Sequence, residues 1–456
     1  MFLRRVTVVN EGQAYPATVL VEGERIARII LPDEEASSGL GAASRAQEVD
    51  GSGCYLLPGV IDEHVHLRDP GLTQKADIAT ESRAAAAGGV TTVMDMPNTL
   101  PPTTTLEALE AKLSALARHC RVNYSAYLGA TNTNADLLGR VDRHRTCGVK
   151  VFMGSSTGGM LVDRREALRR IFGSTDLLIA AHCEDQGLIS AQVKAFQALH
   201  RQAPDDPAPD DLPLALHPLI RSAEACYRSS ALAVQLAQEA GARLHLLHLS
   251  TARELSLLTP GPLDRKRITA EACLAHLLFT DADYSRLGTR LKCNPAVKTR
   301  ADRDALRRAL HDGRIDTVAT DHAPHLLADK QGGALRAASG MPMVQFSLVS
   351  MLGLVDRDVL TLPELVEKMC HAPARLYGIR GRGYLRPGYQ ADMVLVRPLQ
   401  HPWTLTAEHV LSRCGWSPLE GQTFRWRVEK TWVNGRLAYV DGAVSDDCRG
   451  QEIFLN

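Results

Sequence analysis

The sequence predicts an α/β protein, a (β/α)8 (TIM) barrel with a small composite β-sandwich domain formed by both chain ends. Two observations predict this fold class. Short apolar runs alternate with helix-like segments through the middle of the chain, whereas both ends carry alternating apolar and polar residues broken by turns. We therefore expect the N-terminal part of the sandwich at 1–55, the barrel at 56–384 and the C-terminal part of the sandwich at 385–456.

The two ends of the chain predict half-buried strands. "RRVTVVN" (4–10) and "ATVLVEGERIARII" (17–30) alternate in hydropathy near the N-terminus. Near the C-terminus, "ADMVLVRP" (391–398) is followed by "EKTWVNGRLAYVDG" (429–442), whose Asn-Gly is a strong signal for a tight hairpin turn. One β-domain assembled from both ends accounts for this shared character.

Eight apolar runs in the middle of the chain predict the barrel strands. They are "YLLPGVIDEHVHL" (55–67), "GVTTVMDM" (89–96), "VNYSAYLGA" (122–130), "GVKVFMG" (148–154), "DLLIAAHCE" (176–184), "ARLHLLHLS" (242–250), "KRITAEACLAHLLF" (266–279) and "IDTVATDHAPH" (315–325). Helix-like spacing between them is clear at 106–119 and 229–240, and the Pro- and Asp-rich stretch 201–213 predicts an exposed loop. A doubly wound open sheet is the alternative, but the glycine-rich first turn that it needs is absent.

Composition and charge narrow the classes of partner. The 456 residues are 45% hydrophobic and 23% charged, and 52 Lys and Arg balance 52 Asp and Glu. This balance gives no overall field that attracts nucleic acid or an anionic membrane, and no uncharged run approaches the ~20 residues of a membrane span. The ten cysteines contain no CxxC pair, which favours a reducing compartment. We expect a cytoplasmic protein that acts on a small molecule, with no nucleic-acid or membrane partner.

Six side chains that could bind metal lie at or near the ends of five predicted strands. In a barrel, the carboxyl ends of the strands meet at one mouth, where active sites are built. We therefore expect these groups to converge on a metal site. They are His64, His66, Lys150, His182, His248 and Asp321.

The histidines differ in how strongly each indicates a metal. His64 and His66 are two residues apart and share one side of a strand, which suits a divalent cation such as zinc. His182 and His248 each end an apolar run, and either alone is more often a core histidine than a ligand. Taken together with Asp321, these four histidines favour a metal centre. His245 points differently from His248 and is assigned a structural role.

Asp321 and Lys150 leave alternatives open. Asp321 could be a metal ligand, a general base or both, or it could cap a turn. Lys150 lies within an apolar strand, where a charged side chain is rare. In its charged form, an ammonium, it cannot ligate a metal. Burial favours the neutral amine, which could add carbon dioxide and become an anionic carbamate that bridges two cations. The pattern alone favours a lysine whose head reaches water.

Four longer motifs resemble one enzyme family. "PGVIDEHVHLRDPG" (58–71), "MDMPNTLPPT" (94–103), "GVKVFMGSSTG" (148–158) and "ATDHAPHLLADK" (319–330) are similar in order and spacing to the dihydroorotases of the amidohydrolase superfamily. The likeness extends to "GYLRPGYQADMVLV" (383–396) and therefore covers nearly the whole chain.

The resemblance implies a reaction and its cofactors. The reaction is the reversible cyclisation of N-carbamoyl-L-aspartate to L-dihydroorotate in pyrimidine synthesis, through a hydroxide that bridges two divalent metal ions, with Zn2+ favoured. His64, His66 and Asp321 would hold the more buried ion, His182 and His248 the other, and a carbamate on Lys150 would bridge them. Asp321 would be the catalytic residue, moving the proton of the hydroxide to the leaving ring nitrogen.

The resemblance also implies a substrate site, made by Arg68, Asn98, His325 and, with a weaker match, Asn294. Arg68 would share a strand side with His66 and bind the substrate carboxylate, whereas allantoinases tend to carry Asn there and hydantoinases lack the Arg-x-Pro-Gly continuation. Two residues depart from the family: Glu63 is charged where relatives have a small or apolar residue, and Ala275 replaces a histidine found in some relatives, so His276 receives no role.

The alternatives are another cyclic amidase, such as a hydantoinase, dihydropyrimidinase or allantoinase, and a catalytically silent homologue that acts as a binding protein. The oligomeric state to test is a homodimer.

Overall fold

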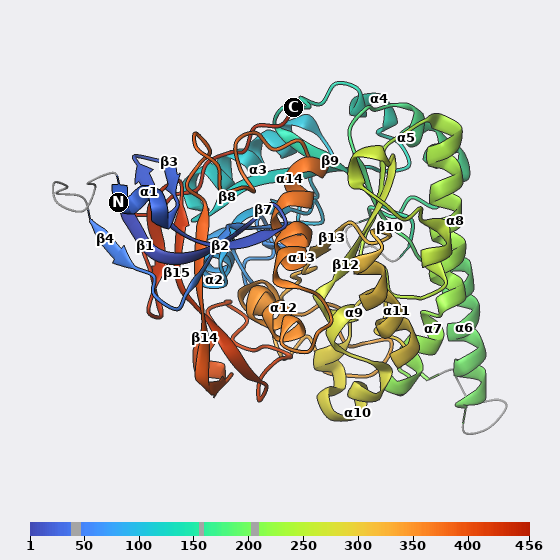
Figure 1. The fold of residues 1–456 in the computed structure, drawn as a ribbon. Coiled ribbons are helices and arrows are strands. Elements are labelled where there is room, and N and C mark those ends of the chain that lie inside the picture. Colours follow the sequence, from blue (N-terminus) through green and yellow to red (C-terminus); the bar gives the residue numbers. More distant parts are fainter. Residues whose placement is uncertain (38–46, 155–158, 202–208) are drawn as a thin grey trace.

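A closed parallel barrel forms the centre of the molecule, as predicted (Figure 1). The structure is a computed structural model that describes residues 1–37, 47–154, 159–201 and 209–456. The eight barrel strands are β6 (Val60–Val65), β7 (Val90–Asp95), β8 (Asn123–Gly129), β9 (Thr146–Phe152), β10 (Ile179–His182), β11 (Leu244–Leu246), β12 (Ile268–Cys273) and β13 (Thr317–Ala319). Within the described residues they follow one another around the sheet in chain order. This order excludes the doubly wound alternative, in which the strand order reverses.

The first and last strands close the barrel at its carboxyl end. The backbone N–H of His66 donates to the carbonyl of His322 over 2.7 Å, and the N–H of His322 donates back to His64 over 3.3 Å. Closure therefore brings the segment after β13, with Asp321, directly beside His64 near the end of β6 and His66 just after it.

The prediction of a single strand over 55–67 is wrong. The run divides at Gly59 into β5 (Tyr55–Pro58), which pairs with the antiparallel sheet, and β6 of the barrel. At Gly59 the backbone donates to the carbonyl of Asp392, and a Cβ would lie 2.1 Å from the Thr91 hydroxyl oxygen. The chain crosses from one sheet to the other at this residue because only glycine fits against Thr91.

Helices surround the barrel, and α3 coincides with the predicted helix at 106–119. Thr105 begins α3 by accepting the N–H of Ala108 over 3.1 Å, and the predicted helix at 229–240 lies inside α8. The α-helices are α1 (Pro32–Ser37), α2 (Ile78–Ala87), α3 (Leu106–His119), α4 (Ala135–Leu138), α5 (Arg165–Gly173), α6 (Gln186–Leu199), α7 (His217–Ile220), α8 (Ala223–Ala240), α9 (Leu274–Leu278), α10 (Tyr284–Leu287), α11 (Arg300–His311), α12 (Ser347–Val355), α13 (Leu362–Val366) and α14 (Ala372–Leu376).

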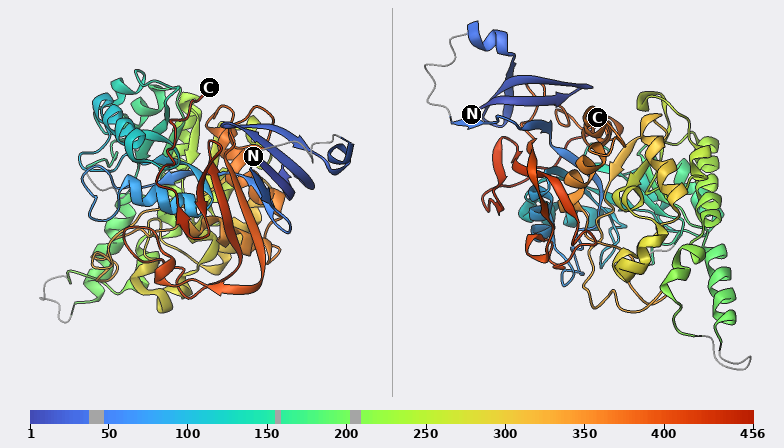
Figure 2. Two further views of the ribbon diagram at one scale, coloured as in Figure 1. Left: turned by 90° about the vertical axis from the view of Figure 1, so that its left-hand side faces the viewer. Right: turned by 60° about the horizontal axis from the view of Figure 1, so that its bottom comes forward.

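The two ends of the chain build one further sheet beside the barrel, seen in Figure 2 as adjoining blue and red strands. Within the described residues its other members are β1 (Phe2–Asn10), β2 (Gln13–Glu22), β3 (Arg25–Ile30), β4 (Glu48–Asp50), β14 (Met393–Thr404), β15 (Thr423–Val433), β16 (Arg436–Val440) and β17 (Ala443–Val444). Val8, Val19, Leu395 and Trp432 share one buried cluster, so both ends contribute to one core. This confirms the composite β-domain, while the domain boundaries in residue numbers stay a prediction.

The predicted Asn-Gly turn joins β15 to β16. Asn434 and Gly435 both have positive φ, 51° and 73°, as a tight hairpin turn requires. All ten cysteines are buried and free. Over the described ranges, we find no helix with the length and apolar character needed to span a membrane. Two stretches that the sequence analysis singled out fall partly outside the described residues: the motif 148–158, at 155–158, and the predicted loop 201–213, at 202–208.

Candidate metal centre and substrate cavity

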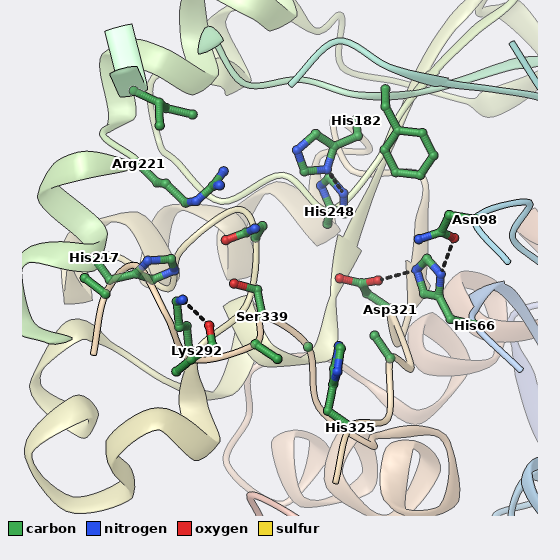
Figure 3. A pocket seen from close by; sticks show the side chains of 18 of the residues that line it. His66, Asn98, His182, His217, Arg221, His248, Lys292, Asp321, His325 and Ser339 are labelled. Carbon is green, nitrogen blue, oxygen red and sulfur yellow. Dashed lines mark hydrogen bonds and ion pairs between the residues drawn. The ribbon is translucent and has the colours of Figure 1, made fainter. Parts of the chain in front are cut away.

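A cavity of about 460 Å³ opens at the carboxyl ends of the barrel strands (Figure 3). All ten residues that the sequence assigned to the site line it: His64, His66, Arg68, Asn98, Lys150, His182, His248, Asn294, Asp321 and His325. The structure therefore brings the whole set together, and the role of each residue stays a prediction.

Three of these residues converge on one point. The Nε2 atoms of His64 and His66 lie 3.3 and 3.1 Å from Oδ1 of Asp321. Burial alone would raise the pKa of the Asp321 carboxyl, but its interactions with His64 and His66 hold that pKa well below its usual range. Two imidazole nitrogens and an ionised carboxylate oxygen are ligands that Zn2+ takes.

Hydrogen bonds on the opposite ring nitrogens orient both imidazoles. Nδ1–H of His64 donates to Glu271 over 2.5 Å, and Nδ1–H of His66 donates to the amide oxygen of Asn98 over 2.7 Å. With the proton on Nδ1, the Nε2 atom of each ring faces Asp321 and can serve as a ligand atom. Burial lowers the pKa of His66 to about 3, so this ring is neutral at physiological pH.

A second pair of histidines lies across the cavity from Asp321, as Figure 3 shows. Nδ1 of His182 and Nε2 of His248 are 2.9 Å apart. His182 donates from Nε2 to Glu184 over 2.9 Å, which leaves its Nδ1 as a lone pair. Burial lowers the pKa of both histidines, so these two nitrogens can serve as ligand atoms of one cation.

Lys150 lies inside β9, and only 1% of its surface is exposed. Its Nζ is 4.6 Å from the centre of the Phe152 ring, and it lines the cavity together with both histidine pairs. The interpretation that the pattern alone favoured, a Lys150 ammonium group that reaches open water, is therefore wrong. Burial lowers the pKa of Lys150 to about 8, so a substantial fraction of the amine is neutral at physiological pH.

Three site residues that are not glycine have left-handed backbone. The φ angles are 66° at Arg68, 38° at His248 and 48° at Asp321. Such conformations cost free energy and concentrate at functional sites. At these positions, each in the segment that follows a barrel strand, the strained backbone directs a side chain into the cavity.

Arg68 reaches the cavity by a different route from the one predicted. The strand ends at Val65, so Arg68 lies in the following loop, and the argument from a shared strand side was wrong. The N–H of Leu67 donates to Asp95 over 2.8 Å and holds this loop, while Nε of Arg68 donates to the carbonyl of Pro324 over 3.1 Å. The guanidinium nevertheless faces the cavity.

A cluster of cations adjoins His325. Arg68 and Lys75 direct donors at its two ring nitrogens, over 3.1 and 3.0 Å. Burial and these cations lower the pKa of His325, and a neutral imidazole has only one lone pair to accept with. One of the two cations therefore faces an N–H, so the arrangement favours an anion entering the cavity.

The model of the amidohydrolase family matches residues 55–438. The chain belongs to this family. Two curated relatives are dihydroorotases. The protein of Halobacterium salinarum is 35% identical over 408 residues, which cover 88% of this chain and 91% of the relative. The protein of Methanosarcina mazei is 31% identical over 431 residues, which cover 92% of this chain and 90% of the relative. The L-hydantoinase of Arthrobacter aurescens, a solved structure, is 27% identical, with a TM-score of 0.91 over 99% of both chains.

The sequence missed five residues of this amidohydrolase that surround the predicted site. Lys75, Arg221 and Lys292 line the cavity, and Glu184 and Glu271 hold the histidines. Glu184 and Glu271 could have been found from the sequence, because each is a charged residue in an apolar run, as Lys150 is. The three cations come from loops, whose approach to the strand ends no local pattern encodes.

We expect Glu184→Gln to weaken the affinity of the His182–His248 pair for a divalent cation by about 10- to 100-fold. Burial alone would raise the pKa of Glu184, but Arg221 and His182 lower it to about 2, so an ionised carboxylate holds His182. Chelator competition on the zinc-loaded amidohydrolase measures the effect. Glu254→Gln is the matched control, because Glu254 is a buried carboxylate that is hydrogen-bonded to Ser230 and Thr251. Equal cation affinities in the two variants would contradict the role of Glu184 in holding His182.

Proposed function

We propose that this amidohydrolase is a dihydroorotase that interconverts N-carbamoyl-L-aspartate and L-dihydroorotate in de novo pyrimidine biosynthesis. The similarity to dihydroorotases over most of the chain supports the proposal. The observation that carries it is Arg68, a buried guanidinium on the cavity wall beside the predicted metal ligands.

Arg68 suits a substrate that bears a carboxylate. Burial lowers its pKa to about 10, so it keeps its charge at neutral pH, and its planar fork matches a carboxylate. Lys75, Arg221 and Lys292 add further positive charge around the cavity. Hydantoin and allantoin have no carboxylate to bind these cations, whereas both proposed substrates do.

The residues present fit two divalent cations. His64, His66 and Asp321 would hold one, and His182 and His248 the other, because their ligand atoms converge in two sets. We infer that Zn2+ is the ion and that Lys150 carries a carbamate between the two. The buried Lys150 amine supports this, since its lowered pKa provides the neutral form that adds carbon dioxide.

Bound at these positions, the cations would supply Lewis acidity and lower the pKa of a water molecule. In the ring-opening direction Asp321, ionised because of its lowered pKa, accepts the proton of the attacking water and delivers it to the departing ring nitrogen. Arg68 and His325 bind the carboxylate and fix the ring. Asn98 directs its amide nitrogen toward the cavity while its oxygen holds His66 (Figure 3). In the closing direction Asp321 takes the proton from the ureido nitrogen.

Turnover of a substrate panel tests the proposed activity. We expect the zinc-loaded protein to hydrolyse L-dihydroorotate, with kcat/KM at least about 100-fold above hydantoin, dihydrouracil or allantoin, because only dihydroorotate offers Arg68 a carboxylate. A preference for hydantoin would favour the hydantoinase alternative. Absence of turnover on the whole panel, with metal bound, would favour the silent homologue.

Metal reconstitution is expected to depend on both carbon dioxide and pH. With a Lys150 pKa of about 8, the neutral fraction rises about 25-fold between about pH 6.5 and pH 8.5. His66 is already neutral at both values, so Lys150 dominates the change. At fixed dissolved carbon dioxide, activity of the apo-protein given Zn2+ should return about 25-fold faster at the higher pH. Reactivation at the same rate without carbon dioxide would contradict the carbamate.

A further inference from the structure

A second group of metal-binding side chains lies inside the barrel, beside the centre described above. Glu63 on β6, His245 on β11 and Glu271 on β12 are all fully buried. One ligand atom from each lies within 4.8 Å of the other two. The proposed function uses neither Glu63 nor His245.

The atoms that face one another here lack partners. Both carboxylate oxygens of Glu63, Oε2 of Glu271 and Nε2 of His245 form no hydrogen bond within the described residues. Buried polar atoms are rarely left in this state, because each costs free energy unless something binds it. Two of these groups are carboxylates, so the missing partner is a cation or a hydrogen-bond donor.

The hydrogen bonds around His245 determine which nitrogen carries its proton. The Thr269 hydroxyl donates to the carbonyl of Leu244 over 3.2 Å, so its oxygen accepts Nδ1–H of His245 over 2.8 Å. The ring then directs its Nε2 toward Glu271, whose Oε2 is 3.7 Å away. That distance is longer than a hydrogen bond but short enough for both atoms to bind one ion.

Glu271 cannot turn away from this point. Its Oε1 accepts from Nδ1 of His64 over 2.5 Å and from the backbone N–H of His248 over 2.9 Å. The other oxygen, Oε2, is therefore directed at His245 and Glu63.

We propose that Glu63, His245 and Glu271 bind a third divalent cation, distinct from the two held by the cavity residues. Two carboxylates and one imidazole form a neutral complex with such an ion and satisfy the unpartnered atoms. Zinc bonds of about 2.0–2.2 Å in tetrahedral geometry place ligand atoms about 3.4 Å apart, so the 3.7 Å pair needs little change, and the Glu63 side chain, within 4.8 Å of both, moves inward. Glu271 links this ion to His64 and so fixes the orientation of that ring.

The number and position of bound ions test the third site. The full chain, produced with zinc and purified without chelator, should hold three Zn2+ by elemental analysis, and anomalous scattering should place one between Glu63, His245 and Glu271. Glu63→Gln and Glu63→Met should each hold two, because one carboxylate is lost. Glu254→Gln should still hold three, since that buried carboxylate lies outside the cluster.

Several outcomes would overturn the third site. They are a wild-type protein without an anomalous peak among these three residues, a water or proton at that point, and a Glu63→Gln protein that keeps all three ions. This test is independent of the proposed function: loss of dihydroorotate turnover with the third ion in place would count against the function alone, and turnover with only two ions would count against the third site alone.

Discussion

Lys150→Ala is expected to lower kcat for L-dihydroorotate by about 1,000-fold or more and to remove at least one of the two cavity cations. Without the carbamate, two cations at the His64–His66–Asp321 and His182–His248 positions repel each other with no anion between them. Removal of the Lys150 side chain also leaves a space beside β9 that a small carboxylic acid can occupy. Added acetate or propionate should therefore restore part of the metal content and activity.

The matched control is Lys368→Ala. Lys368 is another buried lysine, bonded to the carbonyl of Ile315 and absent from the cavity lining, so its loss should leave the metal content unchanged. Elemental analysis and initial rates measure both variants. A Lys150→Ala protein that keeps two cations and wild-type turnover would show that Lys150 bridges nothing.

Arg68→Met is expected to lower kcat/KM for L-dihydroorotate by about 30- to 3,000-fold, because a buried charge-assisted pair with the substrate carboxylate is lost. The metal content should stay the same, since Arg68 hydrogen-bonds to Pro324 and His325 and, within the described residues, to none of the predicted ligands. Any turnover of hydantoin should not fall, because hydantoin offers Arg68 no carboxylate.

Lys75→Met provides the comparison for Arg68→Met. Lys75 also reaches His325 but pairs with Asp329 at 3.3 Å and is more exposed, so a smaller loss is expected. Steady-state kinetics on both substrates, with metal content measured in parallel, separate the two residues. An equal loss on dihydroorotate and hydantoin in Arg68→Met would contradict its role in carboxylate binding.

The barrel could be predicted because its strands and helices follow local periodicity. The helix at 106–119 and the Asn434-Gly435 turn are examples in which short-range patterns and the structure agree. The site could be predicted because polar residues that interrupt apolar runs, such as Lys150 and His182, gather at strand ends, and barrel geometry brings those ends together.

What could not be predicted depends on contacts between distant segments. The division of the first run at Gly59 follows from packing against Thr91, and the route of Arg68 follows from a loop held by Asp95. Lys292 approaches the cavity from a loop outside the predicted strands, so the pattern at strand ends does not mark it. Glu63 could be seen as an unusual charge, but only closure of the barrel places it opposite Glu271.

Electron density at Nζ of Lys150 tests the central claim most directly. In crystals of zinc-loaded protein grown with bicarbonate, we predict density contiguous with Nζ for a carbamate, lying between two anomalous peaks bound by His64, His66 and Asp321 on one side and by His182 and His248 on the other. A bare ammonium with one cation, or with none, would contradict the account.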